Sequence, residues 1–360
     1  MNHPLNHPDD RSITTTMNTT TGQHTDDARH TPAEPPVIRE PRHVPLAHVV
    51  RAGVIEGVHH GSAVVLAADG RVAFQAGDID AAFYPRSALK PVQAVALLRA
   101  GLPLDGALLS LTAASHSGQD THLAGARRIL EEAGLTEDEL RNTPDLPYGS
   151  AMREAWLRAD RKPTRLAQNC SGKHAAMLYT AKLRGWSLED YLDPAHPLQQ
   201  VIAETVEDLT GQRVAQVTVD GCGAPLFSVS PLGLARAAAA IASAAPDTPE
   251  GRVADAMRTY PEMASGDDRD VALLMRKVPG LLAKDGFEGV QMAGLSDGQA
   301  VVVKIADGAD RARMPVTAAA LAHCGIGADV LGEFATAPVV GGDTTVGRLH
   351  ATDTLALPAA

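Results

Sequence analysis

Apolar residues follow two different periods along this chain, and the change between them predicts where strands and helices lie. Short apolar runs flank Asp69-Gly70, and another pair flanks Asp297-Gly298; both dipeptides are typical of β-hairpin turns. The expected strands are 62–67, 71–75, 281–283, 289–294 and 299–305. Strands are therefore expected near both ends of the ordered chain.

Between these strands the apolar residues recur at the helical period. The expected helices are 90–100, 121–133, 173–183, 196–209, 232–244, 250–259, 269–278 and 311–324. One β-branched run, 214–219, is expected to be a further strand. The pattern predicts an α+β fold in which one antiparallel sheet, built from N- and C-terminal strands, packs against a helical block.

Composition divides the chain into an extension and an ordered part. Residues 1–43 are rich in Thr, His, Asp and Pro and lack apolar periodicity, which predicts a disordered extension that can be removed without loss of turnover or thermal stability. The histidines in it leave a metal-binding tail as an alternative. Residues 44–330 are expected to form the functional domain and 331–360 a C-terminal segment.

Charge and residue content narrow the class of partner. The formal net charge of the 360 residues is -11, and aromatic residues are 3%, so a nucleic-acid partner is not expected. No apolar run approaches the ~20 residues of a membrane helix, so no membrane is expected either. Three cysteines cannot form a disulfide framework, and the start lacks a secretory pattern, which favours the cytoplasm.

Ser87 and Lys90 are the strongest candidates for chemistry. Residues three apart lie on one face of a helix, and a serine hydroxyl becomes a nucleophile when a neighbouring base takes its proton. Lys90 can be that base only in its neutral form. The alternative is an exposed serine and lysine on a helix surface. Pro91 predicts that this helix begins irregularly between Ser87 and Pro91.

Three other polar clusters have both a chemical and a structural interpretation. Residues 115–119 either cap a helix or supply a hydroxyl that relays a proton. Lys284 is either a solvated charge at a strand end or the third element of a Ser-x-x-Lys enzyme. Cys170 and Cys222 lie in Gly-rich turns and could bind zinc, with His174 one turn from Cys170 as a further ligand. Two buried thiols or a redox pair are the alternatives, and the third cysteine is expected in the core.

Several segments together resemble one family, the thermolabile, inducible type of rhizobial L-asparaginase. The segments are 51–61, YPRSALKPVQA at 84–94, QNCSGKHAAM at 168–177, DGCGAP at 220–225 and AKDGFEG at 283–289. The likeness covers about residues 46 to 327. It implies a fold similar to serine β-lactamases and glutaminases.

The resemblance also implies the roles of individual residues. The catalytic residues implied are Ser87, Lys90, Ser115 and Lys284. The substrate-binding residues implied are Arg86, Ser117, His174 and Asp220. A single zinc ion is implied between Cys170, Lys173 and Cys222. The likeness thus selects Lys173 as zinc ligand, where general zinc chemistry favours His174.

These implications predict an L-asparagine amidohydrolase, and the general frequency of dimers among soluble oligomers favours a homodimer. Ser87 is expected to form the acyl-enzyme, with Lys90 as general base. The alternatives are a penicillin-recognising Ser-x-x-Lys esterase or peptidase, a glutaminase, and a non-catalytic zinc-binding module. Residues 263–270 depart from the likeness, because a small hydroxyl residue is expected where Asp270-Val271 stands. That departure concerns the wall of the site and hence substrate preference.

Overall fold

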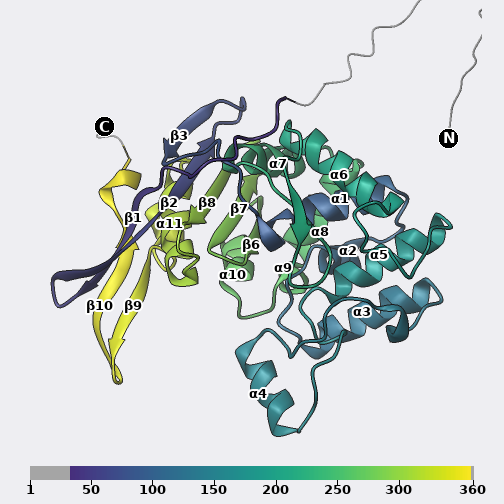
Figure 1. Ribbon diagram of the computed structural model, residues 1–360. Helices are drawn as coiled ribbons and strands as arrows, with labels where there is room; N and C mark the ends of the chain where they lie inside the picture. The colour runs from purple at the N-terminus through teal and green to yellow at the C-terminus, as the bar shows by residue number, and fades with distance from the viewer. Residues whose placement is uncertain (1–32, 358–360) are drawn as a thin grey trace, which may run out of the picture. The chain divides into compact units, whose positions relative to one another are not determined.

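Strands from the two ends of the chain meet in one antiparallel sheet (Figure 1). The computed structural model describes residues 33–357. The strands of this sheet are β1 (Val44–Arg51), β2 (Val54–Leu66), β3 (Val72–Ala76), β6 (Leu281–Gly286), β7 (Val290–Leu295), β8 (Ala300–Ile305), β9 (Thr336–Gly341) and β10 (Thr344–Ala351). Their order is β6-β7-β8-β2-β1-β10-β9, with β3 paired to β2. The predicted α+β class is therefore confirmed.

The middle of the chain forms the helical block. Its elements, with the helices that follow β8, are η1 (Arg86–Leu89), α1 (Lys90–Arg99), α2 (Gly106–Thr112), α3 (Asp120–Glu132), η2 (Glu137–Glu139), α4 (Ser150–Arg158), α5 (Ser171–Leu183), α6 (Pro197–Thr210), α7 (Pro231–Ser243), α8 (Pro249–Thr259), α9 (Pro261–Ala264), α10 (Asp270–Lys277), α11 (Asp310–Ala322), α12 (Ala328–Leu331) and η3 (Asp353–Leu355). A small sheet pairs β4 (Val217–Val219) with β5 (Pro225–Phe227). Figure 1 shows α1 to α6 gathered on one side, with α4 projecting outward.

Helices cover both faces of the central strands. Every residue of β7 is buried, so both its faces are covered, which explains a continuous apolar run instead of alternation. Gln291 of β7 faces α11, because it accepts a hydrogen bond from Arg313. Gly294 of β7 faces α7, because a Cβ added there would collide with the Ala238 carbonyl. Residues three apart on a strand face opposite sides. Helices α7 and α11 therefore cover opposite faces.

Part of the predicted extension is attached to the rest of the protein. The Ala33 amide donates to Gly211 and the Ala82 amide donates to the carbonyl of Val37, while Arg39 forms an ion pair with Asp78. Residues 1–32, the remainder of that predicted extension, lie outside the described residues. Within 33–357, no helix is both long and apolar enough to cross a membrane.

The structure contains strands and helices that the pattern of apolar residues did not predict. Strand β1, the first half of β2, and the β9–β10 hairpin have no counterpart among the expected elements, nor do the helices α2 and α4. Both hairpins predicted from Asp-Gly pairs are present, joining β2 to β3 and β7 to β8. The β9–β10 hairpin completes the sheet beyond residue 331.

Candidate active site

Ser87 lies in a single tight turn at the start of the first long helix. The 3₁₀ turn Arg86–Leu89 runs directly into α1, and Pro91 occupies the first turn of α1, where its missing N–H leaves no helical hydrogen bond unmade. Arg86 has φ 52°, a left-handed conformation that costs a non-glycine residue energy. The irregular helix start predicted from Pro91 is present. It places the half-buried Ser87 within η1, one turn before Lys90 begins α1.

Lys90 joins three of the predicted site segments. Its side chain is 1% exposed, and Nζ donates to the Ala114 carbonyl (2.5 Å), to Ser115 Oγ (3.1 Å) and to Cys170 Sγ (2.9 Å). The Lys90 amide donates to the Ser87 carbonyl, but no described hydrogen bond joins the two side chains. The structure thus brings Lys90, Ser115 and Cys170 into direct contact, with Ser87 one turn away.

The serine-bearing loop is held by the segment before α10. The Ser115 amide donates to Ala264 (3.1 Å), and both the amide and Oγ of Ser117 donate to the Ser265 carbonyl (2.7 and 3.1 Å). Both serines are buried. The cap of α3 is Gln119 with His122, so residues 115–117 are free of the capping role proposed for this cluster.

Lys284 lies on β6, beside the turn that carries Ser87. Its side chain is fully buried, and Nζ donates to Oδ1 and the carbonyl of Asp285 (2.5 and 2.8 Å). Burial lowers the pKa of Lys284 to about 8, against the opposing effect of Asp285 and with a further lowering by Lys90. Lys284 is therefore a buried group and not a solvated strand end.

The glycine after this lysine has a packing reason. A Cβ on Gly286 would overlap the Pro85 carbonyl and lie 3.1 Å from the Ala88 amide nitrogen. Only glycine lets β6 approach η1 this closely. The spacing of Lys284 and Gly286 thus reflects the contact between β6 and the Ser87 turn.

Arg86 and Asp220 already form an ion pair. Arg86 Nε donates to Asp220 Oδ1 at 2.7 Å, and the guanidinium lies 5.3 Å from the Phe287 ring centre. Burial alone would raise the pKa of Asp220, but Lys173 and Arg86 hold it below its ordinary value. A cavity of about 360 Å³ opens beside Arg86. The pair joins the start of η1 to the turn after β4.

The two cysteines share one small buried cluster. Cys170, Cys222 and Ala224 pack together, and Lys173 Nζ lies 3.4 Å from Cys222 Sγ. The Cys222 side chain and burial raise the pKa of Cys170 to about 12. The hydrogen bond from Cys170 and the charge of Lys173 hold the pKa of Cys222 below its ordinary value, although burial opposes this.

This donor set fits a zinc ion. Thiolates are preferred zinc ligands, and Lys173 can coordinate through its amine once it has lost a proton. The described residues contain no group of three or more His, Cys, Asp and Glu side chains suited to a metal, so an all-thiolate-and-imidazole site is not formed here. His174 instead bonds Tyr191 through Nδ1 (2.8 Å). Lys173 Nζ is the nitrogen recorded in contact with Cys222 Sγ, whereas His174 Nε2 is buried without a partner among the described residues.

Sequence reasoning missed a network of charges behind Lys284. Arg269 Nη2 donates to Asp285 (2.7 Å), and the buried Arg313 donates to Asp270 and Asp310 (both 2.6 Å). Burial would raise the pKa of Asp285, but Lys284 and Arg269 hold it well below its ordinary range. The only sequence feature that pointed to this network was the run of acidic and basic residues at 267–270. It indicated a wall of the site but not which residues these side chains contact.

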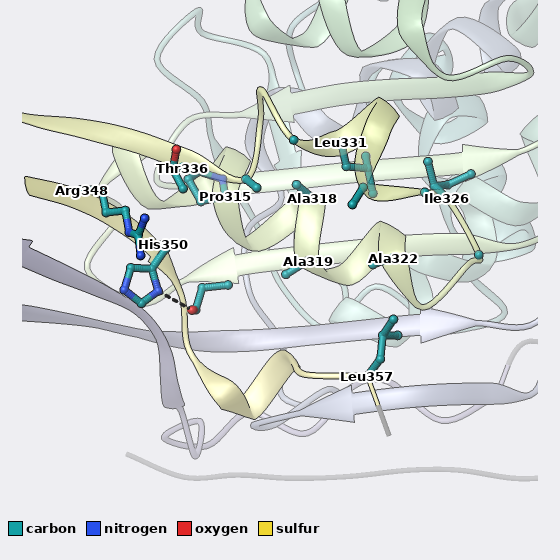
Figure 2. Close-up of a pocket in the computed structure, with 16 residues that line it drawn as sticks. Pro315, Ala318, Ala319, Ala322, Ile326, Leu331, Thr336, Arg348, His350 and Leu357 are labelled. Atoms are coloured by element: carbon teal, nitrogen blue, oxygen red, sulfur yellow. Dashed lines mark hydrogen bonds between the residues drawn. The ribbon is translucent and has the colours of Figure 1, made fainter. Parts of the chain in front are cut away.

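A separate cavity lies away from these groups. It has a volume of about 660 Å³ and lies between α11, α12 and β10, with Arg348 and His350 at one end and Ala318, Ala322 and Leu331 along its length (Figure 2). Its lining includes none of the predicted site residues. The proposed chemistry is therefore confined to the region between β6, η1 and α5.

Comparison with known families supports an amidohydrolase. The model of the L-asparaginase II family matches residues 47–351, most of the chain, and the chain belongs to this family. The resemblance drawn from the sequence motifs is thereby confirmed. No curated protein matches the chain.

Solved structures similar to this chain share little sequence with it. A β-lactamase from Mycobacterium bovis has 16% identity and a TM-score of 0.40, with 73% of this chain and 94% of that chain covered. Mglu in its native form has 17% identity and a TM-score of 0.31, with 73% of this chain and 62% of that chain covered. These are similarities of fold, from which no activity of this chain follows.

Proposed function

We propose that this protein hydrolyses L-asparagine to L-aspartate and ammonia through an acyl-enzyme on Ser87. The observation that supports this most directly is the meeting of Lys90 with Ser115 one turn from Ser87. The family supplies the amide-hydrolysing class, and the buried cations supply a site for an anionic substrate.

In the first half-reaction Ser87 Oγ attacks the side-chain amide carbon. The Oγ–C bond forms, and the hydroxyl proton passes to neutral Lys90. A hydroxyl can donate as well as accept, so Ser115 can reverse its hydrogen bond when Lys90 loses its proton. The proton then passes through Lys90 and Ser115 to the leaving nitrogen as the C–N bond breaks, and ammonia departs.

In the second half-reaction water attacks the aspartyl ester. Lys90 accepts the water proton, the new C–O bond forms, and Ser87 leaves with that proton restored. Backbone N–H groups near Ser87 would stabilise the oxyanion, each typically worth about 3–4 kcal/mol. Atoms balance with one amide and one water consumed.

The substrate's ammonium group would pair with Asp220. Lys173 and Arg86 hold the pKa of Asp220 below its ordinary value, so its carboxylate is ionised beside Arg86. Cys170, Lys173 and Cys222 would hold a zinc ion, whose chemistry here is to fix the turn after β4 against the start of α5. In this proposal every proton is therefore transferred by side chains of the protein and none by the zinc ion.

Two further properties belong to this proposal. The protein is proposed to act as a homodimer, the commonest assembly of such enzymes, and in the cytoplasm. Sedimentation velocity of the full chain tests the first, and fractionation of the source cell tests the second.

The decisive experiment is ammonia release across a panel of amides and β-lactams. We expect L-asparagine to be the best substrate, and acid-quenched enzyme to carry an aspartyl adduct on the peptide containing Ser87. Ser87→Ala should lose turnover, while the control Ser243→Ala, at the exposed end of α7, should keep it. Preference for glutamine or for a β-lactam would instead support one of the alternatives, and full activity in Ser87→Ala would exclude this mechanism.

A further inference from the structure

Arg269 has a buried hydrogen-bond donor that the protein does not use. Its side chain is 17% exposed, and Nη2 is bonded to Asp285, but Nη1 is buried without a partner among the described residues. Guanidinium is charged at every physiological pH and offers five N–H donors. Leaving a charged buried donor unpaired costs more free energy than leaving a neutral one unpaired, so such a group needs an explanation.

This donor lies at the candidate active site. The partner of Arg269 is Asp285, which is also the partner of Lys284. On the other side, a Cβ on Gly266 would collide with Ser117 Oγ and lie 3.2 Å from Arg269 Cγ. Arg269 therefore stands between the two site segments that carry Ser117 and Lys284.

The local charge is unbalanced in the direction that favours an anion. Lys284 and Arg269 are two buried cations that share the single carboxylate of Asp285. The other nearby cation, Arg313, is already matched by Asp270 and Asp310. A carboxylate bound at Arg269 would balance the charge and satisfy Nη1 together.

A surface side chain covers this position. The Tyr148 ring centre is 4.7 Å from Arg269 Cζ, and Tyr148 is 44% exposed. A ligand reaches the guanidinium by displacing one exposed ring, with no change in the core. The loop that carries Tyr148 is anchored next to the site, since the Gly149 amide donates to Ser117.

We propose that Arg269 binds the α-carboxylate of an amino-acid amide substrate, which restricts the enzyme to amides with a free α-carboxylate. This inference rests on the proposed function. Arg269 and Asp220 would then divide the recognition of the backbone end of the substrate: the guanidinium takes the carboxylate, and Asp220 takes the ammonium group. Peptide-bound asparagine and simple carboxamides would be rejected for want of the charge that pairs with Arg269.

The test compares substrates that lack one charged group each. L-asparagine, 3-aminopropanamide (no carboxylate) and succinamate (no ammonium) are assayed with wild type and Arg269→Lys, a variant that keeps the charge facing Asp285. Wild type should favour L-asparagine over 3-aminopropanamide about 100-fold in kcat/KM. Arg269→Lys should raise KM for L-asparagine and succinamate about 10- to 100-fold and leave 3-aminopropanamide unchanged. Arg276→Gln, on the same helix, is the matched control and should behave as wild type.

Each outcome decides the matter. Equal losses for all three amides would show that Arg269 only positions Asp285 and Lys284, which overturns the inference, as would unchanged KM values. If the variant does not fold, a wild type that prefers L-asparagine no more than 3-aminopropanamide overturns it. If wild type hydrolyses none of the three, the proposed function fails, and calorimetry with L-aspartate still tests Arg269: binding weakened by Arg269→Lys supports it, and equal or absent binding contradicts it.

Discussion

At Lys90, the three donors of one ammonium group already have three acceptors. Accepting a proton from Ser87 therefore requires that one of these hydrogen bonds be given up or reversed. The Ser115 hydroxyl can reverse its hydrogen bond, and so can the Cys170 thiol as a weaker donor, whereas the Ala114 carbonyl cannot. The residue-level geometry thus ties the function of Lys90 to Ser115 and Cys170.

Replacement of Lys90 by arginine tests this coupling. A guanidinium cannot give up its proton at working pH, so Lys90→Arg should lower kcat by about 10²–10⁴-fold, the usual contribution of a general base. The measurement is the steady-state rate with L-asparagine, with circular dichroism as the check on folding. More than a tenth of wild-type turnover in a folded Lys90→Arg would contradict the role of Lys90 as base.

Lys284 makes part of the folding free energy depend on pH. Its pKa falls from 10.5 to about 8 in the fold, so between these values the unfolded chain binds more protons than the folded one. Stability should therefore rise as pH increases from about 8 to 10.5, by roughly 3 kcal/mol from this group, and should show no contribution to the slope below pH 8. The charged neighbours are Asp285, Lys90 and Arg269.

Urea unfolding of wild type and Lys284→Met over this pH range isolates that contribution. Other titrating groups act on both proteins, so the difference between the two curves belongs to Lys284. The stability of wild type relative to the variant should rise as pH increases from about 8 to 10.5. A difference that is constant with pH would contradict the lowered pKa.

Sequence patterns located residues that the structure brings together where a motif has a local physical reason, and they missed contacts whose partners are distant in sequence. Ser87, Lys90 and Gly286 belong to short patterns whose spacing has a steric or chemical cause. The pairing of Arg269 with Asp285 joins an element boundary to a strand, and no periodicity marks it. The contact of Lys90 with Cys170 depends likewise on how α5 packs against α1.

Among the elements, β6 and η1 form the contact on which the site depends. Gly286→Ala should push η1 away from β6 and lower kcat/KM at least tenfold, because the added Cβ meets the Pro85 backbone and not a flexible side chain. In the control Gly57→Ala, on β2, the nearest atom would be 3.5 Å away, an ordinary contact. Kinetics and melting temperature of both variants provide the comparison, and equal activity would show that the turn tolerates displacement.

The turn after β4 and the start of α5 are the elements that zinc would join. Removing the metal should raise KM more than it lowers kcat, because Asp220, next to this turn, binds substrate without taking part in bond breaking. Elemental analysis followed by kinetics before and after chelation checks both parts. Protein purified without chelators and free of zinc would contradict the site, and zinc with an unchanged KM would limit it to a structural role.

Element prediction depended on how each strand is covered. Strands buried on both faces, such as β7 and β8, have continuous apolar runs and were found from the sequence. Strand β9 has one buried residue, Val339, among six positions and includes Pro338, so its signal was too weak. The start of β2 is mostly exposed and was missed for the same reason.

For the molecule as a whole, the attachment of residues 33–43 predicts different results for two deletions. Removing 1–43 eliminates the Arg39–Asp78 ion pair and the hydrogen bonds of Ala33 and Val37, so it should lower the melting temperature by a few degrees. Removing 1–32 leaves all of these in place and should change neither turnover nor melting temperature. Calorimetry of both deletion variants tests this prediction. Equal melting temperatures would support the composition-based expectation that the dispensable extension ends at residue 43.

The sheet pairs Ala63 with Val303 and Ala47 with Ala351. During synthesis, β1 and β2 leave the ribosome long before β8 and β10 exist to pair with them. Their exposed edges must stay unpaired while the helical block forms, because contacts between such distant segments close late and slowly. Recovery of active enzyme should therefore depend on protection of the first hairpin during translation, more than on the final stability of the folded protein.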